Sequence, residues 1–219
     1  MNIFNYAAYI FDFDGTLVDS MGIWKQIDVD YLSENNIACP PDLAQDIVAM
    51  GIDELTIYFK NRFNLPHQPN EIKSRWLEMA YHRYMERVPF KAGATEFILH
   101  LSKRNKPLSV ATACYENIVE DYLVRQNMRH YFKDLFFTMN IKKEKPEPDV
   151  YLQAAKHLGV QPKDCLVFED TLEGVQAGKS AGMTVIAVAD SFQKNRQDII
   201  DLSDAFIQDF TTLLTKDSE

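Results

Sequence analysis

The chain has 219 residues, of which 46% are hydrophobic and 25% charged, and 32 acidic residues against 23 basic ones give a net charge of −9. This composition is typical of a soluble globular protein with one large domain or two smaller ones. The acidic balance disfavours nucleic acid and anionic membrane surfaces as partners. The longest apolar run, Tyr6 to Phe11, is six residues long, whereas a membrane-spanning helix needs about 18. The first residues lack the features of a signal peptide, so we expect a cytoplasmic protein.

The three cysteines, Cys39, Cys114 and Cys165, are odd in number and widely spaced, and none forms a CxxC pair. This pattern argues against a disulfide framework and against a zinc site. We expect the three side chains to be small buried residues.

The apolar pattern predicts a short strand, then a long helical stretch, then alternating helices and strands. An aromatic-rich strand at 9–13 ends at an Asp-Gly turn signal. Residues 21–87 have helical spacing, with prolines as interruptions. After Pro89 the expected helices are 95–103, 118–126, 150–158 and 175–181, and the expected strands are 108–112, 135–138, 165–168, 184–188 and 205–207.

Strands that alternate with helices imply a parallel sheet covered on both faces. About 70 mostly helical residues separate the first strand from the second. A structureless loop of that length is implausible in a compact domain. We therefore predict an α/β fold with a Rossmann-like parallel sheet flanked by helices and an inserted α-helical subdomain.

Two carboxylates, Asp12 and Asp14, follow the first strand. Residues two apart share a face of a strand, and ligand sites of open parallel sheets lie at the carboxyl edge. Neighbouring carboxylates repel each other, so either a cation compensates them or one stays protonated. Both outcomes suit catalysis with one Asp as nucleophile and the other as proton donor and acceptor. The alternative is a solvated turn in which Asp-Gly merely ends the strand.

A second acidic pair, Glu169-Asp170, follows the strand expected at 165–168. If both strand ends face one crevice, the carboxyls converge there, and such a cluster favours a hard divalent cation such as Mg²⁺. The alternative is an acidic helix N-terminus capped by Thr171.

Two further residues could bind an anion at the same edge. Thr112 ends the strand at 108–112, and Lys145 stands in a Lys-Pro-Glu-Pro turn before a helix. The alternatives are an ordinary β-branched strand residue and a solvated surface lysine, the interpretation that fits Lys142 and Lys143.

Together these residues resemble the four signature motifs of the haloacid dehalogenase superfamily of hydrolases. The segment from Asp12 to Ser20 looks like motif one, Thr112 like motif two, Lys145 like motif three, and Glu169-Asp170 with Thr171 and Gly174 like motif four. The branch that the chain resembles holds phosphoglycolate phosphatase and β-phosphoglucomutase. The resemblance implies an α/β core domain at 1–18 and 88–219 and a helical cap domain at 19–87. The cap would open and close on hinges near Asp19–Ser20 and Val88–Pro89.

The resemblance also implies roles for the residues. Asp12 would attack phosphorus to form an aspartyl-phosphate, and Asp14 would protonate the leaving oxygen and then activate water. Thr112 and Lys145 would bind the phosphoryl oxygens. Mg²⁺ would be held by Asp12, the Asp14 backbone carbonyl, Asp170 and Glu169, the last directly or through water. The expected protein is a Mg²⁺-dependent phosphatase, a monomer or weak dimer, whose ligand is a small phosphorylated metabolite such as a sugar phosphate.

The chain departs from the β-phosphoglucomutase pattern at two positions. Trp24 stands five residues after Asp19, where those mutases have a histidine, and Glu54 follows Gly51 where they have a phosphate-binding arginine. The mutase is therefore the alternative to the phosphatase. Haloacid dehalogenation and a non-enzymatic regulatory role are less favoured, because the DGT turn and all motif residues are intact. Trp24, Gly51 and Glu54 are the predicted specificity residues, with packing as the alternative for Trp24.

Overall fold

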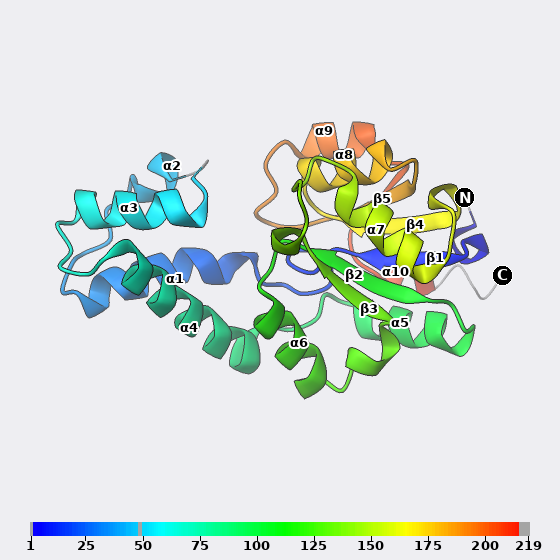
Figure 1. The fold of residues 1–219 in the computed structure, drawn as a ribbon, viewed down its shortest axis with the longest axis horizontal. Helices are drawn as coiled ribbons and strands as arrows, with labels where there is room; N and C mark the ends of the chain where they lie inside the picture. Colours follow the sequence, from blue (N-terminus) through cyan, green and yellow to red (C-terminus); the bar gives the residue numbers. More distant parts are fainter. Residues whose placement is uncertain (1, 48–49, 215–219) are drawn as a thin grey trace. The chain divides into compact units, whose positions relative to one another are not determined.

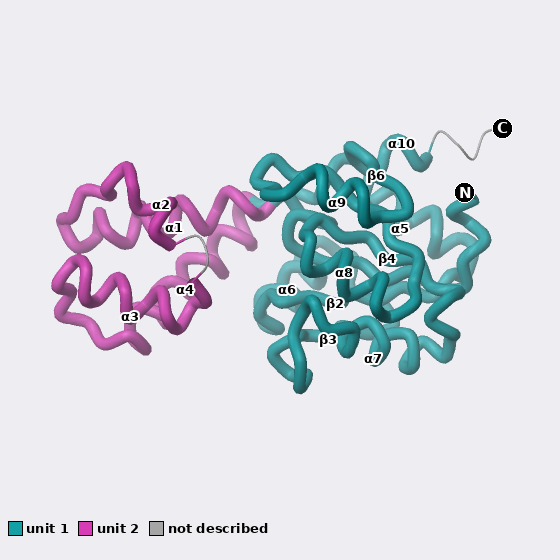
Figure 2. Tube along the Cα trace, turned by 90° about the horizontal axis from the view of Figure 1, so that it is seen from above, with its two compact units in different colours: residues 1–19, 88–219 teal, residues 20–87 magenta. Residues whose placement is uncertain are grey.

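The computed structural model describes residues 2–47 and 50–214. The chain divides into two compact units, residues 1–19 with 88–219, and residues 20–87 (Figure 2). We call them the first and the second unit. The division lies one residue from the predicted boundary after residue 18, and their roles as core domain and moving cap stay a prediction.

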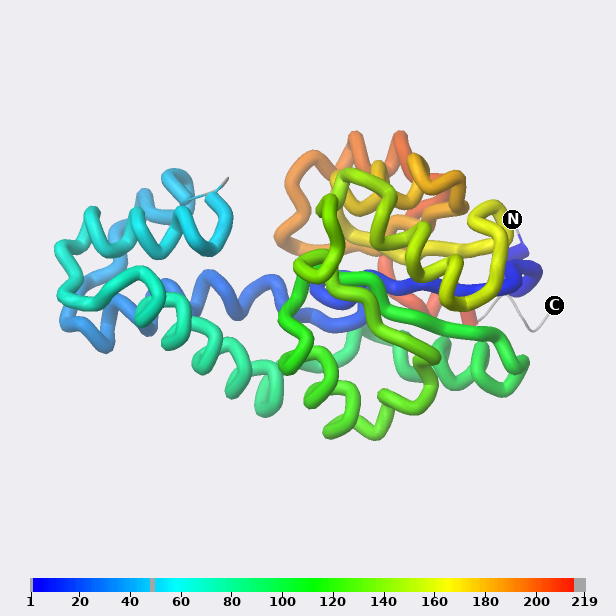
Figure 3. The backbone as a smooth tube through the Cα atoms, viewed as in Figure 1, coloured from blue at the N-terminus to red at the C-terminus, as the bar shows by residue number. Residues whose placement is uncertain are grey.

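Within the described residues, the first unit contains a six-stranded sheet in the order β3-β2-β1-β4-β5-β6 (Figure 1). The strands are β1 (Ala8–Phe11), β2 (Leu108–Thr112), β3 (Asp134–Phe137), β4 (Cys165–Glu169), β5 (Thr184–Val188) and β6 (Ala205–Ile207). Every neighbouring pair is parallel. Figure 3 shows β1, in blue, between the green β2 and the yellow β4, which come from distant parts of the chain. The predicted fold class is confirmed.

Helices cover both faces of this sheet, which explains why β1, β2 and β4 are buried along their whole length. Figure 1 shows α7 (Asp149–Leu158), α8 (Leu172–Ser180) and α9 (Arg196–Leu202) on one face. The other face carries α5 (Ala94–Lys103), α6 (Glu116–Arg125) and α10 (Thr211–Leu214). Short 3₁₀ helices lie at Ile3–Asn5, Arg129–Tyr131, Thr138–Asn140 and Pro162–Asp164.

The two faces have cores of different character. Mainly alanine and valine fill the face under α7 and α8, with Phe136 and Tyr151 among them. Aromatic rings fill the opposite face, where Phe11 stacks on Phe168 with ring centroids 5.0 Å apart. Phe97 and Phe210 complete that aromatic cluster. Dense packing on both faces holds the carboxyl ends of β1 and β4 in fixed register.

The second unit is the helical insertion between β1 and β2. It comprises α1 (Met21–Glu34), α2 (Leu43–Asp46), α3 (Ile52–Arg62) and α4 (Pro69–Arg87). Its core is centred on Trp76, whose ring meets Phe59 edge-on at 4.8 Å and Tyr31 at 5.7 Å. Trp76 therefore packs inside this unit. Among the described residues, no helix combines the length and apolar character needed to cross a membrane.

Candidate active site

Three carboxylates meet at the carboxyl ends of β1 and β4. The chain order of the strands reverses between these two neighbours, the place where open α/β sheets bind ligands. Asp12 directly follows β1, Glu169 ends β4, and Asp170 comes next. All three side chains are buried, and each offers a carboxylate oxygen within 4.8 Å of the others. The Asp12 amide donates to the carbonyl of Phe168 at 2.9 Å, which fixes the two strand ends together.

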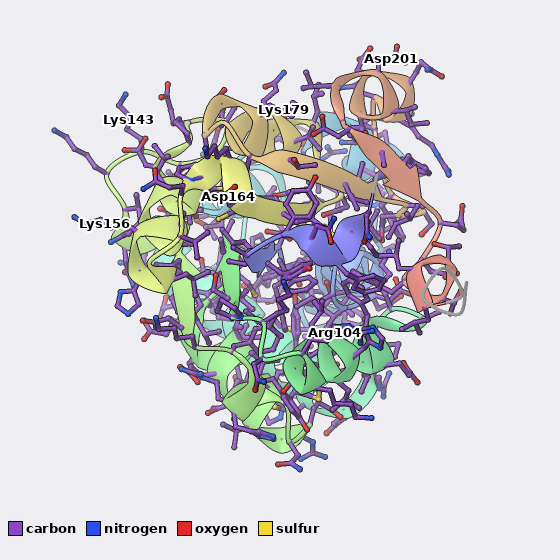
Figure 4. The ribbon with its side chains drawn as sticks, turned by 90° about the vertical axis from the view of Figure 1, so that its right-hand side faces the viewer. Arg104, Lys143, Lys156, Asp164, Lys179 and Asp201 are labelled. Atoms are coloured by element: carbon purple, nitrogen blue, oxygen red, sulfur yellow. The ribbon has the colours of Figure 1, made fainter. Side chains whose placement is uncertain are left out.

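Lys145 supplies the positive charge of this cluster. Its Nζ lies 2.6 Å from Asp12 Oδ1 and 2.5 Å from Glu169 Oε1, and it donates to the carbonyl of Ala111 at 3.1 Å. The neighbouring Lys143, in contrast, is exposed, and within the described residues its ion pair is with Glu147 at 3.4 Å. Figure 4 shows Lys143 extending from the surface of the first unit. Of the two lysines, only Lys145 enters the site.

The Glu169 carboxylate is saturated with hydrogen bonds. Oε1 accepts from Lys145 and from the Tyr151 hydroxyl at 2.7 Å. Oε2 accepts from the Asp170 amide at 2.9 Å and from the amide and hydroxyl of Thr171 at 3.1 and 3.0 Å. Burial opposes ionisation of Glu169, but Lys145 and these donors hold its pKa below the usual range. Glu169 is therefore an ionised group that orients Lys145.

Two glycines allow the backbone to approach these carboxylates. A Cβ on Gly174, in the first turn of α8, would overlap the Glu169 carboxylate. Gly15 has a φ of +76°, which favours glycine, and a Cβ there would overlap the Asp170 carboxylate. The side chain of Thr16 then donates to Asp170 Oδ1 at 2.9 Å. The turn after β1 is thus built around Asp170.

The other two carboxylates resist ionisation in the protein alone. Burial raises the pKa of Asp12 to about 8, against the opposing effect of Lys145. Burial raises the pKa of Asp170 as well, and the nearby Glu169 and Asp12 carboxylates add to it. When all three acids are ionised, their charges exceed that of Lys145 by two. A divalent cation would offset that excess.

The donor set fits magnesium. Carboxylate oxygens are the ligands that Mg²⁺ prefers, and one or two of them suffice beside water and phosphate oxygens. Because both Glu169 oxygens already accept hydrogen bonds, Asp12 and Asp170 are the better candidates for direct ligands. The cluster of Asp12, Glu169 and Asp170 can hold a metal ion.

The remaining predicted residues have definite positions. Asp14 lies partly buried in the turn after β1, where its backbone forms an isolated bridge with Val18. Thr112 ends β2 in a buried position, and its Oγ1 accepts from the Cys114 amide at 3.0 Å. The predicted roles of these two residues stay predictions.

The predicted specificity residues belong to the second unit. Trp24 lies on α1 and is partly buried, and Gly51 is the N-cap of α3. Glu54 lies exposed in the first turn of α3. Their predicted role in substrate choice also stays a prediction.

Sequence reasoning did not identify two residues that contact the site. Tyr151 is one of the buried residues of α7, and its position in the sequence does not differ from that of an ordinary core residue. The centroid of its ring lies 5.2 Å from Lys145 Nζ. Gln193 lies between β5 and α9 and donates to the backbone carbonyl of Asp170 at 2.7 Å. No motif or periodicity marks either position.

The sequence matches the Haloacid dehalogenase-like hydrolase family over residues 9–188. The chain therefore belongs to this family of hydrolases, as the resemblance of its motifs predicted. It is 31% identical over 183 residues to the bifunctional riboflavin kinase/FMN phosphatase of Arabidopsis thaliana, covering 83% of this chain and 48% of that protein. The chain thus spans about half the length of that relative.

Two further proteins match most of this chain and nearly all of their own length. The chain is 28% identical over 195 residues to fructose-1-phosphate phosphatase YqaB of Escherichia coli (strain K12), covering 84% of this chain and 96% of that protein. Its structure is similar to that of CbbY from Rhodobacter sphaeroides in complex with phosphate, with a TM-score of 0.80 at 21% identity, covering 95% and 96% of the two chains. At that identity the structural likeness shows the shared fold.

Proposed function

We propose that this protein is a Mg²⁺-dependent phosphatase that hydrolyses small phosphate monoesters through an aspartyl-phosphate on Asp12. The observation that carries the proposal is the ion pair of the buried Asp12 with Lys145, 2.6 Å apart, beside Glu169 and Asp170 at the carboxyl edge of the sheet. A carboxylate nucleophile next to a fixed cation suits phosphoryl transfer, which depends mainly on positioning and charge neutralisation.

The reaction would take two steps. An Asp12 carboxylate oxygen attacks phosphorus, the bond from phosphorus to the ester oxygen breaks, and Asp14 gives that oxygen its proton. A water molecule then loses a proton to Asp14 and attacks the same phosphorus. The bond to Asp12 breaks, phosphate leaves, and both carboxyl groups return to their starting state. Splitting hydrolysis in this way replaces one difficult step with two easier ones.

Lys145 and Thr112 would bind the phosphoryl group. Lys145 carries a fixed charge, because Asp12 and Glu169 raise its pKa even though burial opposes this. Thr112 ends the strand next to β1, and its hydroxyl can donate to a phosphoryl oxygen. Asp12 and Asp170 would hold Mg²⁺, which when bound neutralises negative charge on the phosphoryl oxygens.

The relatives support a substrate class. Fructose-1-phosphate phosphatase and the FMN phosphatase part of the bifunctional relative are named for small phosphate monoesters. We extend that class to this chain, with a sugar phosphate or related metabolite as substrate. Trp24 and Glu54, where β-phosphoglucomutases carry a histidine and an arginine, disfavour the mutase alternative.

The test is phosphate release from sugar phosphates, phosphoglycolate, FMN, nucleotides and p-nitrophenyl phosphate, with Mg²⁺ and with EDTA. β-Glucose 1-phosphate, with its bisphosphate activator and a readout for glucose 6-phosphate, tests the mutase. We expect Mg²⁺-dependent phosphate release and no isomerisation. Isomerisation without phosphate release would favour the mutase, and full activity in EDTA would contradict the proposed cation.

Two lysines of one loop give a matched pair of variants. Lys145→Met should lower kcat/KM by about 100-fold or more, the cost of removing one donor to a reacting oxyanion. Lys143→Met should stay near the wild type, because Lys143 is exposed and its ion pair is with the exposed Glu147. Equal activities of the two variants would remove Lys145 from the mechanism.

A further inference from the structure

We infer that Gln193 is a positioning residue for Asp170, and that the loop between β5 and α9 thereby sets the affinity of the site for its divalent cation. The inference rests on the proposed function, because it takes Asp170 to be a ligand of the cation. Gln193 would act through Asp170 and would not itself touch substrate or metal.

The side-chain amide of Gln193 joins the ends of two strands. Its Nε2 donates to the carbonyl of Asp170, just beyond β4, and to the carbonyl of Val188, the last residue of β5, both at 2.7 Å. Since both partners are acceptors, the nitrogen of the amide must face them. The backbone of Asp170 is therefore tied to the neighbouring strand by a side chain.

Asp170 is consequently held at two points. Thr16 donates to its carboxylate at 2.9 Å, and Gln193 donates to its backbone carbonyl. Fixing both positions restricts rotation of the carboxylate relative to Asp12. Such restriction matters for metal binding. Removing a group that orients a metal ligand typically lowers the affinity for the metal by about 10- to 100-fold.

The loop that carries Gln193 is itself anchored by an ion pair of a buried aspartate. Asp190, whose side chain is 1% exposed, lies 2.6 Å from Lys91 Nζ. Its other oxygen accepts from the Phe192 amide at 2.8 Å, and Lys91 also donates to the carbonyl of Ala189 at 2.9 Å. These contacts fix the residues on the amino side of Gln193, so its amide reaches Asp170 from a rigid base.

Packing alone does not account for a glutamine at this position. Its Oε1 is buried and accepts no hydrogen bond from the part of the chain that the structure describes. An unsatisfied buried acceptor costs about 1–3 kcal/mol. An apolar side chain would avoid that cost but would release the Asp170 carbonyl. Only a side chain that donates a hydrogen bond at this position can hold the Asp170 carbonyl.

The experiment measures metal binding by the full chain, independently of turnover. Gln193→Met keeps the length of the side chain and removes its donor. Gln197→Met is the matched control, because Gln197 Nε2 donates to the exposed Asp201 at 2.8 Å on its own helix, α9, away from Asp170. Binding of Mn²⁺, followed by electron paramagnetic resonance, and of Mg²⁺, followed by calorimetry, gives dissociation constants without substrate. Thermal unfolding in EDTA reports the purely structural effect.

We expect Gln193→Met to raise the Mn²⁺ dissociation constant about tenfold, and Gln197→Met to leave it within a factor of about two. If Gln193→Met does not fold, Gln193→Asn, too short by one methylene group to bridge both carbonyls, replaces it with the same expected direction. A lower unfolding temperature with an unchanged dissociation constant would overturn the inference. A wild-type protein that binds neither metal would instead overturn the proposed function.

Discussion

The substitution Tyr151→Phe removes a hydrogen bond to the ionised Glu169 and leaves the packing of the buried ring unchanged. The substitution keeps the ring 5.2 Å from Lys145 Nζ and removes only the hydroxyl that donates to Glu169 Oε1 at 2.7 Å. Of its two described donors, Oε1 would then keep Lys145. A hydrogen bond to a charged group contributes about 1.5–3 kcal/mol, so we expect the free energy of unfolding to fall by about 2 kcal/mol.

The same substitution should also affect the reaction. With one donor fewer, Glu169 attracts Lys145 more strongly, and Lys145 neutralises Asp12 less. We expect kcat/KM for p-nitrophenyl phosphate to fall by about tenfold, equivalent to about 1.4 kcal/mol. Urea unfolding and steady-state phosphate release measure the two effects.

The control is Tyr9→Phe, in a buried strand position, whose hydroxyl donates to the neutral carbonyl of Ile3 at 2.8 Å. It should cost about 1 kcal/mol of stability and leave kcat/KM unchanged. If Tyr151→Phe matches Tyr9→Phe in both measurements, the proposed coupling of Tyr151 to Lys145 is refuted.

Three further predictions concern pH, packing and metal. Burial raises the pKa of Asp28 on α1 to about 7, above an unfolded value of about 3.9, so folding loses stability as pH rises from about 4 to 7. Because Asp28 is only partly buried, we expect Asp28→Asn to be about 1–2 kcal/mol more stable than the wild type at pH 8 and equal to it near pH 4; urea unfolding at both values checks this. Gly174→Ala should destabilise the protein by about 2–4 kcal/mol, since its Cβ meets the Glu169 carboxylate. Gly51→Ala, at the N-cap of α3 with nothing within 4 Å, should cost less than about 1 kcal/mol, because an N-cap favours glycine over alanine; equal unfolding curves would refute the contact. Mg²⁺ at about 100 times its dissociation constant should add about 2.7 kcal/mol of stability, raising Tm by about 5–10 °C over EDTA; an unchanged Tm would argue against the cation site.

The fold was predictable because its signals are local. The expected strands at 108–112, 184–188 and 205–207 coincide with β2, β5 and β6, since buried strands are short apolar runs between turns. Helix α9 has a single buried residue, Ile199, and the described part of α10 has four residues. Neither presents an apolar stripe long enough to detect.

The site was predictable only in part. The topology of a parallel sheet places residues after β1 and β4 at one edge, so the proximity of Asp12 and Asp170 could be predicted from the sequence. Tyr151 and Gln193 reach their partners across 18 and 23 residues of sequence. Such contacts depend on the packing of α7 and of the loop after β5, which spacing does not encode.

The most direct test of the central claim is to identify the phosphorylated residue. The protein is mixed with ³²P-labelled substrate and Mg²⁺, quenched in acid, digested and analysed by mass spectrometry. We predict label on Asp12, released by hydroxylamine, and absent from an Asp12→Asn protein that retains the wild-type circular dichroism spectrum. Label on another residue, or wild-type turnover by Asp12→Asn, would contradict the account.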